Sequence, residues 1–388
     1  RLIQSAMIIA GIGTLIQLFP LWKIGSGLPI VMGISFTFVS IFCYIGPTYG
    51  YNAIVGAVLV GGIVEGVLGL FAKYWIKLIS PIVAASVVTS IGFSLLSVGA
   101  SSFGGGSGSE NFGSATNWIL GTITLLSCII FNILAKSYFK QLSVLFGLIV
   151  GYIVAVIMGV VDFSSLSGTS IVAVPSLMPF KPEFNANAIF SVILIFLVSA
   201  TETIGDTSAL AASGLNRDVT TKETSGSIAC DGFISALSSV FGCLPITSFS
   251  QNVGLVAMNK VVNRFSIATG GIFLIACGLF PKLAALISIM PQSVLGGAAV
   301  MMFSSIIVSG IQLITKEPLD ARRLSIVSVA LGVGYGMGVS PAILEHTPQA
   351  VQLMFGESGI VPAAFVAILL NVILPKSKPA NEETSKDE

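Results

Sequence analysis

Long runs of apolar residues, separated by short polar or glycine-rich segments, make up almost the whole chain. A helix needs roughly 20 mostly apolar residues to cross the hydrocarbon core of a membrane. We therefore predict thirteen membrane-spanning helices. They lie near residues 2–22, 29–46, 51–72, 81–99, 117–138, 141–161, 185–212, 225–242, 244–262, 265–280, 292–314, 324–341 and 359–375. The shorter apolar stretch 282–290, just before Pro291, is typical of an interfacial helix.

The basic residues give these helices an orientation. If the C-terminal tail is cytoplasmic, the cytoplasmic ends of the spans carry all but three of the 18 Lys and Arg residues. The exceptions are Arg1, Lys181 and Lys282. Cytoplasmic loops of membrane proteins carry such an excess of positive charge. We therefore expect a multi-pass protein of the cell membrane with a cytoplasmic C-terminus. Because Arg1 opens directly onto a span, we also expect that one earlier helix precedes it in the intact protein, giving fourteen.

Composition excludes other classes of protein. The 388 residues are 54% hydrophobic and 9% charged, with a mean hydropathy of +0.97. A soluble domain carries about 25% charged residues, and the net charge of +1 supports no binding of nucleic acid. The five cysteines form no CxxC pair, and the single histidine, His346, lies in a polar loop. We expect no metal site, no cofactor and, without a HExxH or GxSxG motif, no enzyme.

Two spans begin with a similar broken segment. Residues 27–38 and 242–254 each contain Leu-Pro-Ile, followed within a few residues by Ser-Phe. Proline disfavours helix in the residue before it, and β-branched residues follow. We expect each segment to enter as a short strand and then to become a helix. Paired discontinuous segments in two halves of a chain indicate the binding site of a transporter, although a chance similarity in an apolar chain is the alternative.

Four acidic residues fall inside the predicted spans: Glu65, Glu202, Asp206 and Asp231. An acid at this depth costs roughly 2.5–3.5 kcal/mol on insertion scales and is a candidate functional residue. Glu202 and Asp206 are four residues apart, so they share one side of a helix. The alternative is that each acid only bonds backbone or hydroxyl groups between helices. Glu65, which has no polar motif around it, fits that alternative best.

Polar residues after the second broken segment supply a partner for the acids. Ser250, Gln251 and Asn252 follow one another there. An amide offers both donors and acceptors, whereas an ionised carboxylate only accepts. Glu202 facing an amide suits a flat ligand with alternating N–H and C=O groups, such as an oxidised purine or pyrimidine. Phe36, in the first broken segment, is placed to stack on such a ring.

These residues resemble a known family. The stretch from Gln251-Asn252-Val-Gly to Asn259-Lys260 is similar to the signature of the nucleobase–ascorbate transporters, the nucleobase:cation symporters. Glu202-Thr-Ile-Gly-Asp206 resembles the xanthine and uric acid permease branch; a uracil permease would carry His at the second and fifth of these positions. The similarity covers essentially the whole chain. One departure is Asn259, where the signature has Thr.

The resemblance implies a fold and a division of the chain. The fold is an all-α polytopic membrane protein built from two inverted repeats of seven helices, with two short antiparallel strands at the broken helices. The core domain comprises residues 1–78 and 185–290. The gate domain comprises residues 79–184 and 291–375, and residues 376–388 form a cytoplasmic tail. Members commonly work as homodimers.

The resemblance also implies roles for individual residues. Glu202 and Gln251 hold the base by their side chains. Ser250 and Phe36 offer backbone groups, and Phe36 also stacks on the ring. Asp231 supports the site from the next core helix, while Asp206 and Asn252 are expected to assist binding or coupling.

The expected function is therefore uptake of a purine base, xanthine or uric acid, by secondary transport. Burial favours the neutral form of a carboxyl group, so Glu202 or Asp206 can take up a proton that accompanies the substrate. Sodium is the alternative coupling ion, because acids and unwound carbonyls also bind it. Alternative functions are a permease for uracil or another nucleobase, and an anion transporter or channel built on the same inverted repeat.

Overall fold

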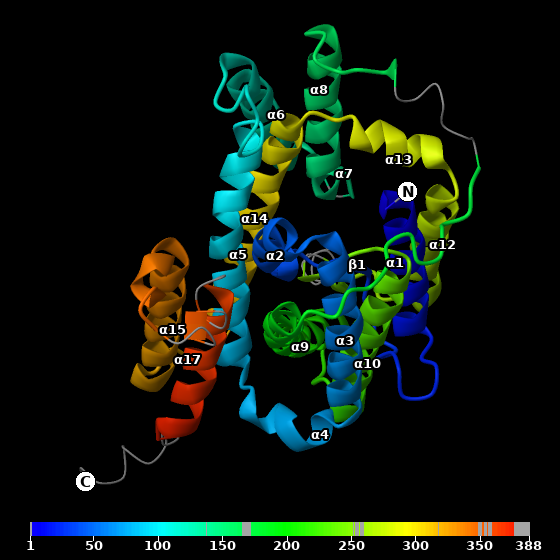
Figure 1. Ribbon diagram of the computed structural model, residues 1–388. Helices are drawn as coiled ribbons and strands as arrows, with labels where there is room; N and C mark the ends of the chain where they lie inside the picture. The colour runs from blue at the N-terminus through cyan, green and yellow to red at the C-terminus, as the bar shows by residue number, and fades with distance from the viewer. Residues whose placement is uncertain are drawn as a thin grey trace.

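The computed structural model describes residues 2–136, 138–164, 172–250, 252, 256, 260–316, 318–347, 351–352, 355 and 359–375, and these are mostly helical (Figure 1). The first half contains α1 (Leu2–Leu18), β1 (Met32–Ile34), the 3-10 helix η1 (Phe36–Phe38), α2 (Val39–Tyr49), α3 (Tyr51–Leu70), α4 (Ala72–Trp75), η2 (Ile76–Leu78), α5 (Pro81–Phe103), α6 (Ala115–Leu134), α7 (Tyr138–Gln141) and α8 (Ser143–Ile157). The second half contains α9 (Ala186–Leu215), α10 (Thr221–Val240), β2 (Ile246–Ser248), α12 (Arg264–Gly278), α13 (Pro281–Ser288), α14 (Gln292–Ile314), α15 (Ala321–Val339), η4 (Pro341–Leu344) and α17 (Ile360–Ile373).

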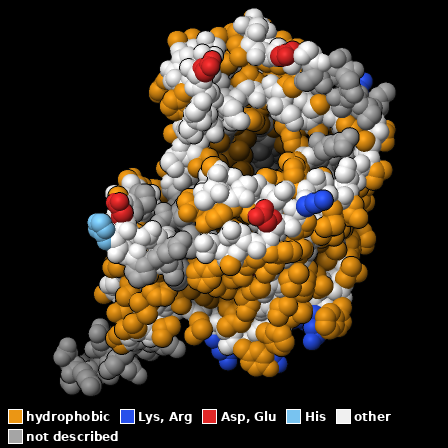
Figure 2. Space-filling model, viewed as in Figure 1, with side chains coloured by type: hydrophobic (Ala, Val, Ile, Leu, Met, Phe, Trp, Pro, Cys, Tyr) orange, Lys and Arg blue, Asp and Glu red, His pale blue; other side chains and the backbone are white. Residues whose placement is uncertain are grey.

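Several of these helices have the length and apolar character of membrane spans. Within the described ranges, five qualify alone: α3, α5, α6, α9 and α14. The pair α12 and α13 is bent by 83° and qualifies as a sixth if it counts as one span. Its second member matches the expected interfacial helix. On the face in Figure 2, hydrophobic side chains form a broad belt, and Lys and Arg lie mainly along the lower edge.

The helices pack in two groups, seen side by side in Figure 1. In one group α5 and α14 run together, with α6, α8, α15 and α17 beside them. In the other, α3 packs on α9 and α10, and α1 packs on α12.

Close glycine contacts hold each group together. A Cβ on Gly69 of α3 would lie 2.3 Å from the backbone nitrogen of Ala229, and one on Gly310 of α14 would lie 2.7 Å from that of Thr89.

The two broken segments form short strands, as their sequences predict, and the strands meet as a small antiparallel sheet, as the family resemblance implies. Strand β1 pairs with β2 so that Gly33 lies opposite Thr247. The N–H of Ser35 donates to the carbonyl of Pro245 at 2.9 Å, extending the pairing beyond the strands. Buried backbone groups must find partners inside the protein at this depth, and each strand supplies them to the other. The sheet places the two halves of the chain around one point.

Candidate functional site

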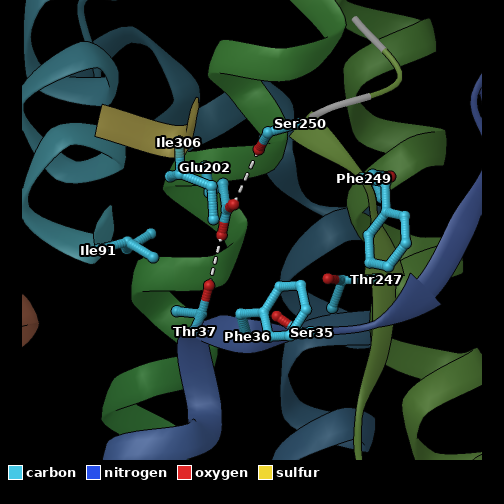
Figure 3. Close-up of a pocket in the computed structure, with 10 residues that line it drawn as sticks. Ser35, Phe36, Thr37, Ile91, Glu202, Thr247, Phe249, Ser250 and Ile306 are labelled. Carbon is cyan, nitrogen blue, oxygen red and sulfur yellow. Dashed lines mark hydrogen bonds between the residues drawn. The ribbon is translucent and has the colours of Figure 1, made fainter. Parts of the chain in front are cut away.

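A small cavity lies where the two strands end (Figure 3). Its lining comes from both broken segments and from helices α5, α9 and α14. The lining residues are Ser35, Phe36, Thr37, Ile91, Glu202, Thr247, Ser248, Phe249, Ser250 and Ile306. The cavity volume is about 10 Å³, enough for about one water molecule. Pockets for organic ligands usually measure about 300–1,000 Å³, so the site is closed in this state.

The carboxyl group of Glu202 lies at the centre of this cavity. The hydroxyl of Thr37, just after β1, donates to Oε2 at 2.7 Å. The hydroxyl of Ser250, just after β2, donates to Oε1 at 2.9 Å. Both bonds are drawn in Figure 3. Glu202 therefore joins α9 to both broken segments.

Ser250 also connects Glu202 to Asp206. Its hydroxyl oxygen lies 2.9 Å from Asp206 Oδ2 as well as from Glu202. One hydroxyl group carries a single proton and so donates one full hydrogen bond. Two normal bonds therefore require one of the carboxyls to carry a proton and donate it to the serine oxygen. The geometry suits a pair of acids that share one proton.

Asp231 is held differently. Its carboxylate accepts hydrogen bonds from the hydroxyls of Thr203 at 2.7 Å and Ser248 at 2.9 Å. The amide of Gln17, in α1, donates a third at 3.2 Å. Three donors suit an ionised carboxylate. Asp231 thereby connects α1, α9 and β2, and its partner Ser248 lines the cavity.

Two aromatic rings flank the cavity. The rings of Phe36 and Phe249 are nearly parallel, with an interplanar angle of 3° and centroids 6.4 Å apart. Phe303 of α14 meets the Phe36 ring edge-on, with centroids 5.2 Å apart. Parallel rings present flat apolar faces that favour stacking with another flat ring.

Several residues of this arrangement were not identified from the sequence. Phe249 was missed although Ser248-Phe249 repeats Ser35-Phe36, so the internal repeat already indicated it. Thr37 and Gln17 were also missed, because hydroxyl and amide side chains are common in spans and their partners lie far away along the chain. The Thr37 contact crosses 165 residues, and the Gln17 contact with Asp231 crosses 214.

The remaining candidates take other places. The amide of Asn252 donates to the carbonyl of Pro29 at 2.8 Å, so it ties the two broken segments together. Gln251 and Asn259 lie outside the described residues.

Glu65 lies in α3, outside the cavity lining. The expectation that Glu65 bonds polar groups between helices is wrong, because neither carboxyl oxygen has a hydrogen-bond partner of normal geometry among the described residues.

Comparison with known proteins gives a consistent picture. The model of the Permease family, that of xanthine and uracil permeases, matches residues 1–343. The chain is 33% identical over 389 residues to the xanthine permease of Bacillus subtilis, covering 98% of this chain and 88% of that protein. It is 35% identical over 380 residues to the uric acid permease PucK of the same organism, covering 97% and 88%. The xanthine permease XanQ of Escherichia coli is 32% identical, with 96% and 83% covered.

Solved structures share the fold at much lower identity. The murine anion transporter Slc26a9, in its inward-facing state, aligns with a TM-score of 0.61 at 13% identity, over 96% of this chain and 65% of that one. The transmembrane domain of the cyanobacterial bicarbonate transporter BicA aligns with a TM-score of 0.56 at 15% identity, over 95% and 89%. The fold is therefore that of a helical, multi-pass membrane protein of the 7+7 inverted-repeat type.

Proposed function

We propose that this chain, a nucleobase permease that belongs to the xanthine and uracil permease family, imports a purine base together with protons. The proposed base is xanthine or uric acid. The similar proteins named above include both a xanthine permease and a uric acid permease, at nearly equal identity. Thr203 and Asp206 stand where a uracil permease is expected to carry histidines. This supports a purine rather than uracil as substrate.

The observation that carries the proposal is the position of Glu202 between Thr37 and Ser250. Those hydroxyls donate to the two carboxylate oxygens of Glu202. In a complex, ring N–H groups of a purine would donate to the same two oxygens. A hydrogen bond to a charged group contributes about 1.5–3 kcal/mol. Phe36 and Phe249 then stack on the two faces of the base, and the Gln251 amide pairs with its remaining polar edge.

Proton coupling follows from the contact between Glu202, Ser250 and Asp206. Because the acids share one proton through Ser250, a purine that takes the place of the Ser250 hydroxyl changes where that proton resides. Carrying the proton with the purine also lowers the charge that crosses the membrane interior.

Transport in this proposal is a movement of a core domain (residues 1–78 and 185–290) against a gate domain (residues 79–184 and 291–375). Backbone contacts at glycines such as Gly69 and Gly310 hold each domain together. Across the site, Val198 of α9 and Phe36 meet Ile91 and Ile306 through apolar side chains, which can slide. Separating these side chains opens the closed cavity. The proposal includes thirteen spans in this chain, a homodimer and a cytoplasmic C-terminus.

The experiment is uptake of labelled xanthine, uric acid and uracil into proteoliposomes that contain the purified protein. We expect accumulation of xanthine or uric acid that rises when the outside is made acidic, with no response to a sodium gradient. Uptake of a purine that ignores the proton gradient would contradict the coupling. Accumulation of uracil alone would contradict the choice of a purine.

Anion transport is the second candidate, because the aligned structures are of a bicarbonate transporter and an anion transporter. The carboxyl of Glu202 in the cavity opposes it, since an anion and a carboxylate repel each other. The same proteoliposomes distinguish the two functions. Chloride or bicarbonate flux without purine uptake would favour the second candidate.

A further inference from the structure

One buried acid, Glu65 in the middle of α3, has no part in the proposed purine site. Its side chain is fully buried, and among the described residues both carboxyl oxygens lack a hydrogen-bond partner. Hydrogen bonds hold the other three acids of the predicted spans. The hydroxyl of Ser199, on α9, also lacks a partner of normal geometry, yet it lies close enough to act on the Glu65 carboxyl as a donor. Two unpartnered polar groups therefore face each other between α3 and α9.

The surroundings of Glu65 leave little room for water. A Cβ on Gly62 would lie 2.6 Å from the backbone nitrogen of Ala236 in α10, and one on Gly66 would lie 2.8 Å from the ring of Phe233. These glycines stand on either side of Glu65 along α3. The carboxyl group is therefore enclosed by closely packed helices.

The charged groups that face Glu65 are also acids. Asp231 of α10 and Glu202 of α9 act on it by their charges. Helix α2, which also packs on α3, carries no Asp, Glu, Lys, Arg or His; its titratable side chains are Cys43, Tyr44 and Tyr49. An ionised carboxylate without a cation or hydrogen bonds is strongly disfavoured in such a place. Glu65 is therefore neutral and holds a proton in this state.

We propose that Glu65, facing Ser199, is a second proton-carrying site of the permease, separate from the residues that bind the purine. A purely structural role is not supported in this state, because the carboxyl forms no bond that would stabilise the packing. A metal ion needs several oxygen ligands, whereas one carboxyl and one hydroxyl suffice for a proton. This inference rests on the proposed function, proton-coupled purine uptake.

The site is linked to purine transport through charge. The Glu65 carboxylate takes one proton from the external side and becomes a neutral carboxyl group, and on the cytoplasmic side the carboxyl loses that proton again. When Glu65 is ionised, its unpaired charge adds to those of Glu202 and Asp231 and disfavours movement of the purine-loaded core domain through the membrane interior. Protonation of Glu65 and passage of the bound purine are therefore coupled. Two protons then accompany each purine, one at Glu65 and one shared by Glu202 and Asp206.

The test is the number of protons per purine in proteoliposomes with the membrane potential clamped at zero. Each coupled proton allows up to about tenfold accumulation for each unit of pH gradient. At one unit we expect about 100-fold accumulation by the wild type and about tenfold by Glu65→Gln, a neutral side chain of similar shape. Glu110→Gln, in an exposed loop, is the matched control and should behave as the wild type.

The outcomes separate the two claims. A wild type that transports purine with no response to the pH gradient contradicts the proposed function itself. A wild type coupled to a single proton overturns the second site, whether or not any variant folds. Equal stoichiometry in wild type and Glu65→Gln also overturns it. If Glu65→Gln does not fold, Ser199→Ala replaces it: we expect slower proton-driven uptake with unchanged purine exchange, and equal proton-driven uptake would contradict the role of the pair.

Discussion

At the scale of residues, the four acids of the predicted spans differ in what bonds to them. Asp231 accepts three hydrogen bonds, and Glu202 and Asp206 meet at the single hydroxyl of Ser250. Glu65 has no such bond among the described residues. A carboxylate with several donors is held ionised, whereas one that shares a donor or lacks one exchanges a proton more readily. The same residue type thus occurs in three different hydrogen-bonding environments.

Replacing Ser250 with Ala tests the shared hydroxyl. The change removes a donor that the purine has to displace from Glu202, so purine affinity should rise by roughly 10-fold to 100-fold, the equivalent of a charged hydrogen bond of about 1.5–3 kcal/mol. Calorimetric titration of the purified protein with purine measures this change in affinity. Ser309→Ala, which removes an exposed hydroxyl of α14, should bind as the wild type. Unchanged affinity in Ser250→Ala would show that the hydroxyl is not part of the site.

At the scale of elements, close glycine contacts decide how the helices pack. A Cβ on Gly69 would lie 2.3 Å from the backbone of Ala229, so Gly69→Ala should separate α3 from α10 and cost about 1–3 kcal/mol. Gly270→Ala, in α12, meets nothing within 4 Å and should leave stability unchanged or slightly higher. Thermal unfolding in detergent measures both. Equal melting temperatures for Gly69→Ala and the wild type would contradict the described contact.

The stability of the start of α10 depends on pH. Thr220 and Glu223 form a capping box, and Arg217 donates to the Glu223 carboxylate. The Arg217 guanidinium, together with donors from Thr220, lowers the pKa of Glu223 from 4.5 to about 2. The ionised form is therefore favoured by folding, and its stabilisation is present above pH 4.5 and lost as the pH falls towards 2.

Glu223→Gln checks this linkage. At pH 7 the variant should be less stable by at most about 1 kcal/mol, because the ion pair is partly exposed. The difference should shrink as the pH falls from 4.5 towards 2. Unfolding by denaturant at several pH values measures it, with Glu110→Gln as the control. A difference that stays constant down to pH 2 would argue against the contribution of the ionised carboxylate.

Much of the fold at this scale could be predicted from the sequence. The apolar runs, the prolines of the broken segments and their shared Ser-Phe predict the spans and the two strands. The acids stand out because charge is rare in the spans. The partners of these groups could not be predicted in the same way. Met32 pairs with Ser248, and Thr37 with Glu202, only because the two halves fold around one point. Periodicity along one chain carries no information about that meeting.

At the scale of the whole molecule, the site is closed. Its cavity of about 10 Å³ admits no purine, so binding requires the two groups of helices to separate. Their contact near the site consists of apolar side chains from α5, α9, α14 and α17. Gly205, between Glu202 and Asp206, faces Ala84 of α5, where an added Cβ would lie 3.0 Å from the Ala84 side chain.

Gly205→Ala tests whether this contact moves. The added methyl group tightens the contact between the groups without removing a polar contact of the cavity. We expect purine uptake to slow several-fold, as a tightened contact raises a barrier by about 1 kcal/mol, while equilibrium affinity stays near that of the wild type. Gly332→Ala, with nothing within 4 Å on α15, is the control. Wild-type uptake by Gly205→Ala would contradict a movement at this contact.

The most direct test of the account is proton-driven purine uptake by Glu202→Gln. The substitution keeps the size of the side chain but removes the carboxyl that accepts from Thr37 and Ser250. In proteoliposomes with an acidic exterior, the account predicts that the wild type accumulates xanthine or uric acid, whereas Glu202→Gln accumulates neither and yet melts near the wild-type temperature. Full uptake by the folded variant would contradict the central role of this carboxyl.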